Sequence, residues 1–590
     1  MPSTAALTMN YRDFLVLLPE VTLAFWGLIV LAADLGFWRA RPDDVRLRRL
    51  GVLTLIGCAV ALAAAALPLL SRFAILDPST CPLVNDYSSN PDPLVFFGTI
   101  ADDLLTQLFN LVLIVMFALV VRMSMSWQFT TSWGEYFALL CWSTVGMMLL
   151  LASEDLITLF ITLETMTICL YLATGIEKNR LRSSEGAFKY FVYGSVSSAL
   201  FLFGLSLVYG LTGTTRFGAI REILAPIVEP DRLLHATHMT VIGEGLAGQV
   251  AGATAVLLLM AGFGFKIAAV PFHQWAPDAY EGAPAPVTAW LAAGSKIASM
   301  IALMKVLLGA LGPWSASAAS VLSPGWIGVV VVLSSLSMTY GNFAALAQRN
   351  FKRMLAYSSI AHAGYMLIGV AAAGLSTRRY ESAGSVLFYL IVYGFTNIGA
   401  FAVASWLARD LGSDDIDDLG GVGRAYPFLA VCIVLMMLSL IGMPPFGGFF
   451  GKLYMFMEAL SQPGDQVSRL TLIWLVALGL FNSVVSAFYY VRVLKAMFLR
   501  GPTRGTLKPA SSAIVLPILV GTFVVVATGL NPRPLVEFAK DAAVPMLSDG
   551  GSTAARTAST PPRVVPIAPP PAPAPSKTVA TAAEVAARVE

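Results

Sequence analysis

Apolar runs of about 20 residues recur along the whole chain, separated by short polar segments. An α-helix needs a run of about this length to cross the hydrocarbon layer of a bilayer. The alternating ten-residue segments of a membrane β-barrel do not occur. We therefore predict an all-α, polytopic membrane protein. Its fourteen spans are expected near residues 14–37, 49–70, 101–122, 135–152, 156–176, 186–211, 249–272, 285–309, 326–346, 354–374, 384–408, 427–459, 470–498 and 512–530.

Proline and glycine interrupt two of these spans at corresponding places. The fourth member of spans four to eight contains VPFHQWAPDAYEGAPAP, and the fourth member of spans nine to thirteen contains MPPFGGF. Because each unit has an odd number of helices, the second copy must be inverted, as in many transporters with ion sites at broken helices.

The predicted organisation has five parts. They are an N-terminal three-helix segment (1–134), a first half-channel repeat (135–309), a second inverted repeat (326–498), a C-terminal helix (499–535) and a Pro/Ala-rich tail (551–590) that we expect to be disordered. We expect broken helices in spans seven and twelve. The acidic run DDIDDLGG at 414–421 is interpreted as a solvated loop.

Composition and the placement of basic residues agree with this picture. The chain is 57% hydrophobic and only 12% charged, about half the charge fraction of soluble domains. Lysine and arginine are more frequent in the loops after odd-numbered spans, which predicts that those loops are cytoplasmic and that both termini lie on the opposite side. The five cysteines form no CxxC pair, so we expect neither a zinc nor an iron–sulfur site, and no cofactor in this chain.

Four charged residues lie near the middle of predicted spans: Glu164, Lys266, Lys296 and Lys452. A charge at the centre of a bilayer helix costs about 2.5–3.5 kcal/mol on insertion scales. We therefore expect these side chains to face one another, or water, inside the bundle. Such charges are typical of a path for ions, most simply protons.

Three further residues extend this path, and each assignment has a simpler alternative. Lys189, one turn into span six, could compete with Lys266 for Glu164, or could extend to the membrane surface. The Glu164–Lys266 pair could itself be a static bridge, although buried ion pairs stabilise poorly. His273 and His362 lie at membrane depth and could relay protons, or could be hydrogen-bonded core residues.

Several segments resemble one family. LLASEDLITLFITLETMTICLYLATG, FKIAAVPFHQWAPDAYEGAPAPVTAWLAAGSKIA and NFKRMLAYSSIAHAGYMLIG are similar to the antiporter-like membrane subunits of proton-pumping NADH:quinone oxidoreductase, respiratory complex I. LETMTICLYLATG and GGFFGKLYMF are similar to the N-type pattern. The second of these carries a lysine where M-type subunits have a glutamate. Lys305, close to Lys296, departs from the single axial lysine expected in span eight.

The resemblance implies roles, partners and a location. Glu164 and Lys266 would form the pumping pair, Lys189 would modulate it, and Lys296, Lys452, His273 and His362 would line the hydrophilic axis. NADH, FMN, iron–sulfur clusters and quinone would be bound by other subunits. M-, L-, K- and J-type subunits would be the partners in a bacterial inner membrane. Two rival functions stay open: a stand-alone cation/proton antiporter subunit, and a purely structural membrane-arm subunit.

Overall fold

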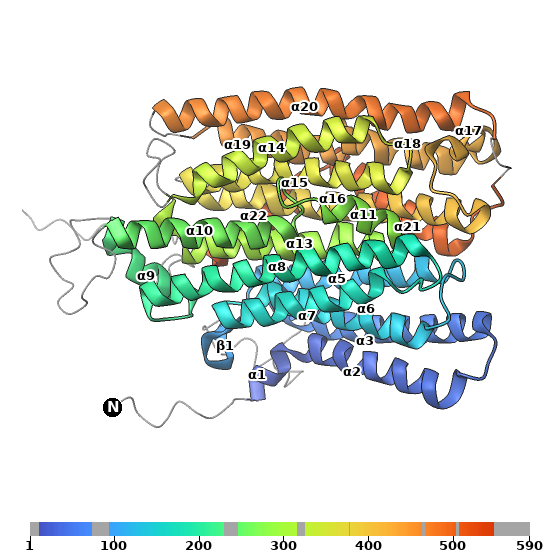
Figure 1. Cartoon of the computed structure of the whole chain (residues 1–590), viewed down its shortest axis with the longest axis horizontal. Helices are drawn as coiled ribbons and strands as arrows, with labels where there is room; N and C mark the ends of the chain where they lie inside the picture. The colour runs from blue at the N-terminus through green and yellow to red at the C-terminus, as the bar shows by residue number, and fades with distance from the viewer. Residues whose placement is uncertain are drawn as a thin grey trace, which may run out of the picture. The chain divides into compact units, whose positions relative to one another are not determined.

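The structure is a computed structural model that describes residues 11–72, 94–228, 246–315, 325–376, 378–462, 466–502, 505 and 507–547. The predicted tail at 551–590 lies outside the described residues. Within them, thirteen helices are long and apolar enough to cross a membrane. The predicted all-α, multi-span fold is therefore confirmed, and the long helices run side by side (Figure 1).

The bounds of the long helices follow the predicted spans closely. They are α2 (Leu18–Ala33, extended by η2, Asp34–Trp38), α3 (Asp43–Arg72), α5 (Leu104–Ser124), α6 (Trp133–Ala152), α7 (Leu156–Thr174), α8 (Leu181–Thr212), α10 (Leu246–Lys266), α14 (Trp326–Leu346), α15 (Phe351–Leu375), α16 (Arg379–Leu411), α20 (Gln466–Leu499) and α21 (Ser512–Leu530). The eighth span is composed of α12 (Ala285–Trp290), η5 (Leu291–Ser295), α13 (Lys296–Met304) and η6 (Lys305–Ala310).

Span seven is broken where the sequence predicts it. The regular helix α10 ends at Lys266, Ala268 adopts a left-handed conformation (φ 58°), and Val270–Pro271 is a cis peptide bond. The chain resumes as α11 (Trp275–Gly282). Proline lacks a backbone donor and collides with the preceding helical turn, so α10 cannot continue through Pro271.

Span twelve is broken in the same way. It is divided into α18 (Pro427–Ile441) and α19 (Gly447–Leu460), each below the length of the thirteen spans. Between them lie Gly442 (φ 90°) and the cis bond Pro444–Pro445. A left-handed residue followed by a cis proline therefore ends the first half of both broken helices.

Two short helices and one loop differ from the sequence expectation. Helix α9 (Phe217–Val228) lies between the predicted spans at 186–211 and 249–272, and α22 (Arg533–Leu547) follows the last span. The Arg221 guanidinium of α9 donates to the carbonyl oxygen of Leu547 at 3.2 Å, so α9 and the end of α22 lie at the same end of the bundle. The smaller elements are α1 (Tyr11–Val16), β1 (Leu94–Val95), β2 (Ile100–Ala101), η8 (Ile416–Leu419) and α17 (Val422–Ala425).

The interpretation of residues 414–421 as a solvated loop was wrong. Asp414 and Asp418 are buried, and the loop is tied to the start of α15 by the Phe351 N–H, which donates to the Asp414 carbonyl at 2.6 Å. The carboxylate of Asp414 pairs with Lys352 at 3.3 Å. The ion pair with the buried Lys352 therefore holds this acidic run against the helix bundle.

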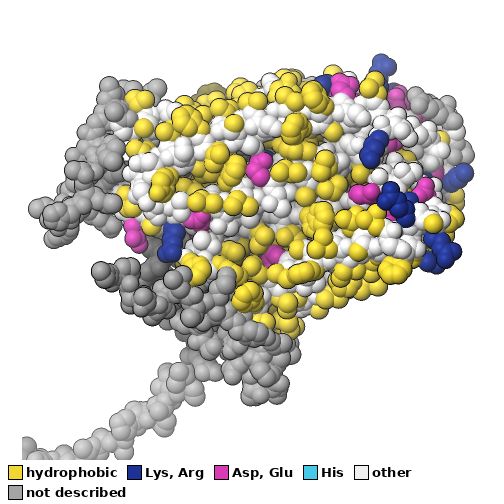
Figure 2. All heavy atoms as spheres, turned by 60° about the horizontal axis from the view of Figure 1, so that its bottom comes forward, with side chains coloured by type: hydrophobic (Ala, Val, Ile, Leu, Met, Phe, Trp, Pro, Cys, Tyr) yellow, Lys and Arg dark blue, Asp and Glu magenta, His cyan; other side chains and the backbone are white. Residues whose placement is uncertain are grey.

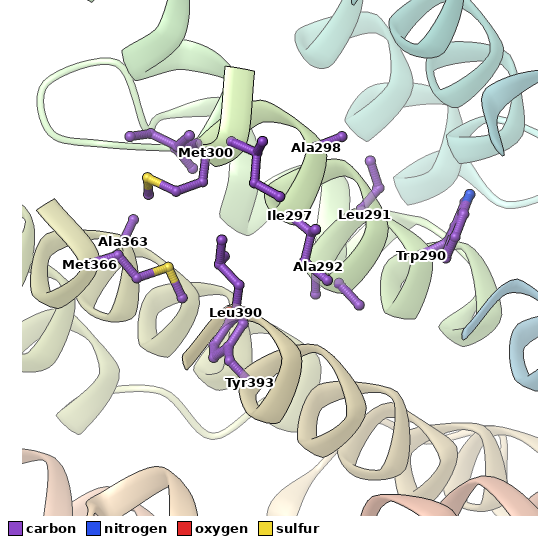
Figure 3. Packing of buried hydrophobic residues seen from close by; sticks show 14 of the residues in the cluster. Trp290, Leu291, Ala292, Ile297, Ala298, Met300, Ala363, Met366, Leu390 and Tyr393 are labelled. Atoms are coloured by element: carbon purple, nitrogen blue, oxygen red, sulfur yellow. The ribbon is translucent and has the colours of Figure 1, made fainter. Parts of the chain in front are cut away.

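The eighth and eleventh spans form the centre of the bundle. The most apolar parts of residues 285–310 and 379–411 are fully buried, whereas only 22% of the corresponding part of Leu18–Trp38 is buried. Figure 3 shows Ile297 and Met300 of α13 turned toward Met366 of α15 and Leu390 of α16. Hydrophobic side chains are spread over the face shown in Figure 2, and most of the lysine and arginine side chains in view gather toward one end of the bundle. This distribution suits a protein surrounded by lipid.

Candidate functional site

Glu164 and Lys266 meet between α7 and α10. The Lys266 ammonium lies 3.3 Å from Glu164 Oε1 and donates to the Thr167 hydroxyl at 2.6 Å. The Ser198 hydroxyl of α8 donates to the same carboxylate oxygen at 2.6 Å. The Lys266 side chain is 2% exposed and that of Glu164 is 22% exposed. The pair is therefore buried on the lysine side and partly open on the carboxylate side.

Lys189 contacts other carboxylates. Its ammonium lies 2.7 Å from Asp278 Oδ2 and 2.6 Å from Glu185 Oε1. Lys189 and Ser198 are on the same helix, and at 1.5 Å per residue they are separated by about 13 Å along its axis. Lys189 thus lies well away from the level at which Ser198 holds Glu164, and its competition for Glu164 stays a prediction.

A larger ion network surrounds Asp278, in the first turn of α11. Arg353 donates to Asp278 at 2.6 Å and to Glu281 at 3.0 Å, and Arg182 pairs with Glu281 at 2.8 Å. Arg353 is on α15 and Arg182 is on α8, so the network joins the two predicted repeats. Sequence reasoning missed this network, because the partners are far apart along the chain.

Lys296 lies in the fully buried eighth span. Its ammonium donates to both the backbone carbonyl and the hydroxyl of Ser359, each at 2.5 Å. It also lies 5.8 Å from the centre of the Tyr393 ring. The residue follows the π-helical turn η5 directly, and such turns are frequent at functional sites. Lys296 forms no ion pair in the described part of the chain, so neutral oxygens and a ring solvate its charge.

His362 is one helical turn beyond Ser359 on α15, and so lies on the same side of that helix. Its Nδ1 is 2.6 Å from the Tyr389 hydroxyl, and its Nε2 is 3.2 Å from the Tyr490 hydroxyl. The ring is 1% exposed. Both ring nitrogens therefore have hydroxyl partners that can exchange the roles of donor and acceptor.

Lys452 lies at the second helix break. Its ammonium donates to the carbonyl oxygens of Leu440 and Ile441, at 3.2 and 2.9 Å, which are the last carbonyls of α18. It also lies 4.4 Å from the centre of the Tyr365 ring. A cation is favourable at a helix C-terminus, where the backbone dipoles present their negative end. The break in span twelve thus creates the binding site for this lysine.

His273 occupies the turn between α10 and α11. Its side chain is buried and packs on the Tyr340 ring, with centroids 4.5 Å apart. Its Nδ1 has no hydrogen-bond partner among the described residues. His273 makes no direct hydrogen bond to Lys266 or to Lys296.

Lys305 and Glu154 make a further ion pair, buried on the lysine side, which the sequence reasoning did not identify. The ammonium lies 2.7 Å from Glu154 Oε1 and donates to the Leu151 carbonyl at 2.9 Å. Burial raises the pKa of the Glu154 carboxyl, and the adjacent Lys305 charge acts in the opposite direction. The unexpected second lysine of span eight therefore has its own carboxylate and is not an unpaired charge.

The polar groups form two clusters. Glu164, Lys266, Thr167 and Ser198 make one. In the other, Lys296 bonds to Ser359, His362 lies one turn farther along α15, and Lys452 packs on the Tyr365 ring. No side-chain hydrogen bond within the described residues joins Lys266 to Lys296, so transfer between the clusters requires bridging water. The described residues contain no group of three or more His, Cys, Asp or Glu side chains that could hold a metal ion. The chemistry that the site supports is proton exchange among lysines, a carboxylate, a histidine and hydroxyls.

Comparison with known proteins places the chain in a family. Residues 153–486 match the family described as "NADH:quinone oxidoreductase/Mrp antiporter, TM". NADH-quinone oxidoreductase subunit N 2 of Symbiobacterium thermophilum is 40% identical over 76% of this chain and 84% of its own length. The subunit N of Rhodospirillum rubrum is 36% identical over 89% of this chain and 96% of its own length.

A solved structure agrees with these relatives. A chain of respiratory complex I from Thermus thermophilus with bound aureothin superposes with a TM-score of 0.66 and 28% identity, over 88% of this chain and 99% of that one. The family match over residues 153–486 includes both helix breaks and the buried Lys266, Lys296 and Lys452. The chain belongs to the subunit N family of NADH-quinone oxidoreductase, within the wider NADH:quinone oxidoreductase/Mrp antiporter transmembrane family.

Proposed function

We propose that this chain is the N-type, proton-translocating membrane subunit of an NADH:quinone oxidoreductase, respiratory complex I. The observation that carries the proposal is the set of three buried lysines, Lys266, Lys296 and Lys452, each at or next to a helix break or a π-helical turn. Keeping three such charges inside a membrane bundle is costly, and charges of this kind typically mark a path for ions or protons. The relatives named subunit N support the assignment to this complex.

The proposed roles follow the contacts. Glu164 stabilises the charged form of Lys266 at 3.3 Å, and the loss of that contact favours release of the lysine's proton. Lys296 passes a proton through Ser359 toward His362, and Lys452 is the terminal acceptor. Lys189 modulates the pair from the ion network around Asp278. His273 has a free ring nitrogen that water could join to Lys266.

The two broken helices support two half-channels, over residues 135–309 and 326–498, that follow the N-terminal three-helix segment. The basic side chains that gather at one end of the bundle favour that end as the cytoplasmic one. Both termini would then lie on the other side of a bacterial inner membrane. M-, L-, K- and J-type subunits are the proposed partners, and they or other subunits would bind NADH, FMN, the iron–sulfur clusters and quinone.

A stand-alone cation/proton antiporter subunit is the second candidate, because the family includes Mrp antiporters. It would catalyse transport without NADH oxidation. The subunit N relatives cover more of this chain than the shared family region and argue for the redox-driven complex. A purely structural role is the third candidate, and it predicts that neutralising the buried lysines impairs assembly but not transport.

The test uses the intact complex reconstituted into vesicles, with NADH-driven quinone reduction and proton uptake followed together. Lys296→Met removes the charge and keeps an unbranched side chain of similar length. Lys178→Met, in the exposed loop after α7, is the matched control. We expect Lys296→Met to assemble and to lower the protons taken up per quinone reduced, and Lys178→Met to match wild type. Normal proton uptake by an assembled Lys296→Met complex would contradict the proposal.

A further inference from the structure

A small cavity lined by both polar and apolar residues lies among the N-terminal helices, at the edge of the first predicted repeat. It has a volume of about 20 Å³ and is bounded by α2, by the C-terminal part of α3 and by the start of α5. A space of at least about 10–15 Å³ is enough for one water molecule. The cavity therefore has room for a single water-sized ligand.

Four side-chain oxygens at this cavity have no hydrogen-bond partner among the described residues. They are Glu20 Oε2, Thr106 Oγ1, Gln107 Oε1 and Asn110 Oδ1. The exposed fractions of these residues are 3, 4, 8 and 5%, respectively. Buried oxygens of this kind normally have a hydrogen-bond partner. Four of them at one cavity therefore indicate a ligand that several oxygen atoms contact at once.

The hydrogen bonds of the amide nitrogens fix how the Asn110 and Gln107 side chains are oriented. Asn110 Nδ2 donates to Glu20 Oε1 at 2.8 Å, and Gln107 Nε2 donates to Asp102 Oδ1 at 2.8 Å. Turning either amide around would place an oxygen against a carboxylate oxygen. The amide oxygens are therefore the atoms left for a ligand.

Two carboxylates, those of Glu20 and Asp102, border the cavity. No lysine or arginine in the described part of the chain pairs with Glu20, and the charged group that acts on it is Asp102, another carboxylate. On α5, Asp103 accepts from the Thr106 N–H at 2.8 Å and so offsets the positive end of that helix. On α6, which also packs on α2, the acid Glu135 is exposed. A buried carboxylate in these surroundings is stabilised either by a positive charge nearby or by a proton of its own.

We infer that this cavity binds one sodium ion through Glu20, Thr106, Gln107 and Asn110, and that a proton on Glu20 competes with it. Carboxylate, amide and hydroxyl oxygens are the donors that hard cations prefer, and nitrogen and sulfur donors are absent from the set. A neutral water would offer two hydrogens but no charge. This inference uses helices outside the proposed proton path and does not rest on it.

The experiment measures binding of ²²Na⁺ to the purified intact complex, in choline buffers at about pH 6 and pH 8. Wild type is compared with Glu20→Gln, with Thr106→Val and with the control Glu135→Gln. We expect wild type and Glu135→Gln to bind one Na⁺ more per complex at pH 8 than Glu20→Gln does. Thr106→Val should weaken that Na⁺ about tenfold, and acidification to pH 6 should displace it from wild type.

Two results would overturn the inference. One is equal Na⁺ binding by wild type and Glu20→Gln. The other is a carboxyl infrared band at Glu20 that titrates without any Na⁺ binding, because Glu20 would then bind only a proton. If Glu20→Gln does not assemble, Thr106→Val decides, and Na⁺ binding equal to that of wild type would contradict the inference. The readout is ion binding, so a failure here is distinct from a failure of proton translocation.

Discussion

Replacing Glu164 by glutamine removes one charge from the buried pair and leaves most of the local packing. The Ser198 hydroxyl donates to Glu164 Oε1 at 2.6 Å, and the amide oxygen of glutamine can accept the same bond. Lys266 keeps its bond to the Thr167 hydroxyl at 2.6 Å. We therefore expect the variant to fold and to assemble into the complex.

The loss concerns the charged form of Lys266. Two unit charges at the observed 3.3 Å interact with about 5 kcal/mol at an effective dielectric constant of about 20. Because the Glu164 side chain is 22% exposed, water reduces this value, and we take roughly 2–4 kcal/mol. Each 1.4 kcal/mol is a factor of ten, so the charged form of Lys266 should become at least tenfold rarer relative to the neutral form.

The assay is NADH-driven proton uptake into vesicles that contain the reconstituted complex, with quinone reduction recorded in the same sample. Glu164→Gln should lower the protons taken up per quinone reduced. Glu135→Gln, an exposed acid at the start of α6, should behave as wild type. A fully assembled Glu164→Gln complex with wild-type proton uptake per quinone would show that the pair is only structural.

Three further perturbations follow from the contacts. Lys189→Ala should reduce proton uptake less than Glu164→Gln in the same assay, because the Lys189 side chain is 37% exposed and contacts two other carboxylates. Glu154→Gln leaves the buried Lys305 charge without its carboxylate, and should lower stability by about 3–5 kcal/mol. A lower thermal unfolding temperature of the complex checks this, with partial recovery in the double variant Glu154→Gln/Lys305→Met. Gly442→Ala places a side chain at φ 90° and 3.0 Å from Lys452, so proton uptake should fall although no charge is removed.

Much of the fold follows from local sequence signals. Hydrophobic runs identified each span, and prolines identified the breaks at Pro271 and Pro444–Pro445, because those effects act within a few residues. Helices α9 and α22 were missed. Both are short and amphipathic, and they are held by packing at the end of the bundle, as the Arg221 contact with Leu547 illustrates. The acidic run at 414–421 was misread because its partner Lys352 lies some 60 residues earlier in the chain.

The sequence predicted which residues belong to the site better than it predicted the contacts that these residues make. Membrane depth alone marked Glu164, Lys266, Lys296 and Lys452, since burying a charge is costly at any position. Partner choice depends on three-dimensional placement. The sequence left open whether Lys189 competes for Glu164 or extends to the membrane surface, and it did not reveal the contact with Asp278. The solvation of Lys452 by the last carbonyls of α18 becomes visible only when the break is seen in three dimensions.

The central claim is that Lys266 carries protons through this subunit during NADH oxidation. The most direct measurement is the number of protons taken up per quinone reduced by the assembled Lys266→Ala complex in vesicles, compared with the exposed-loop control Lys178→Ala. The account predicts a clear drop for Lys266→Ala, at least as large as that of Glu164→Gln, and a wild-type ratio for Lys178→Ala. An assembled Lys266→Ala complex that keeps the wild-type ratio would contradict it.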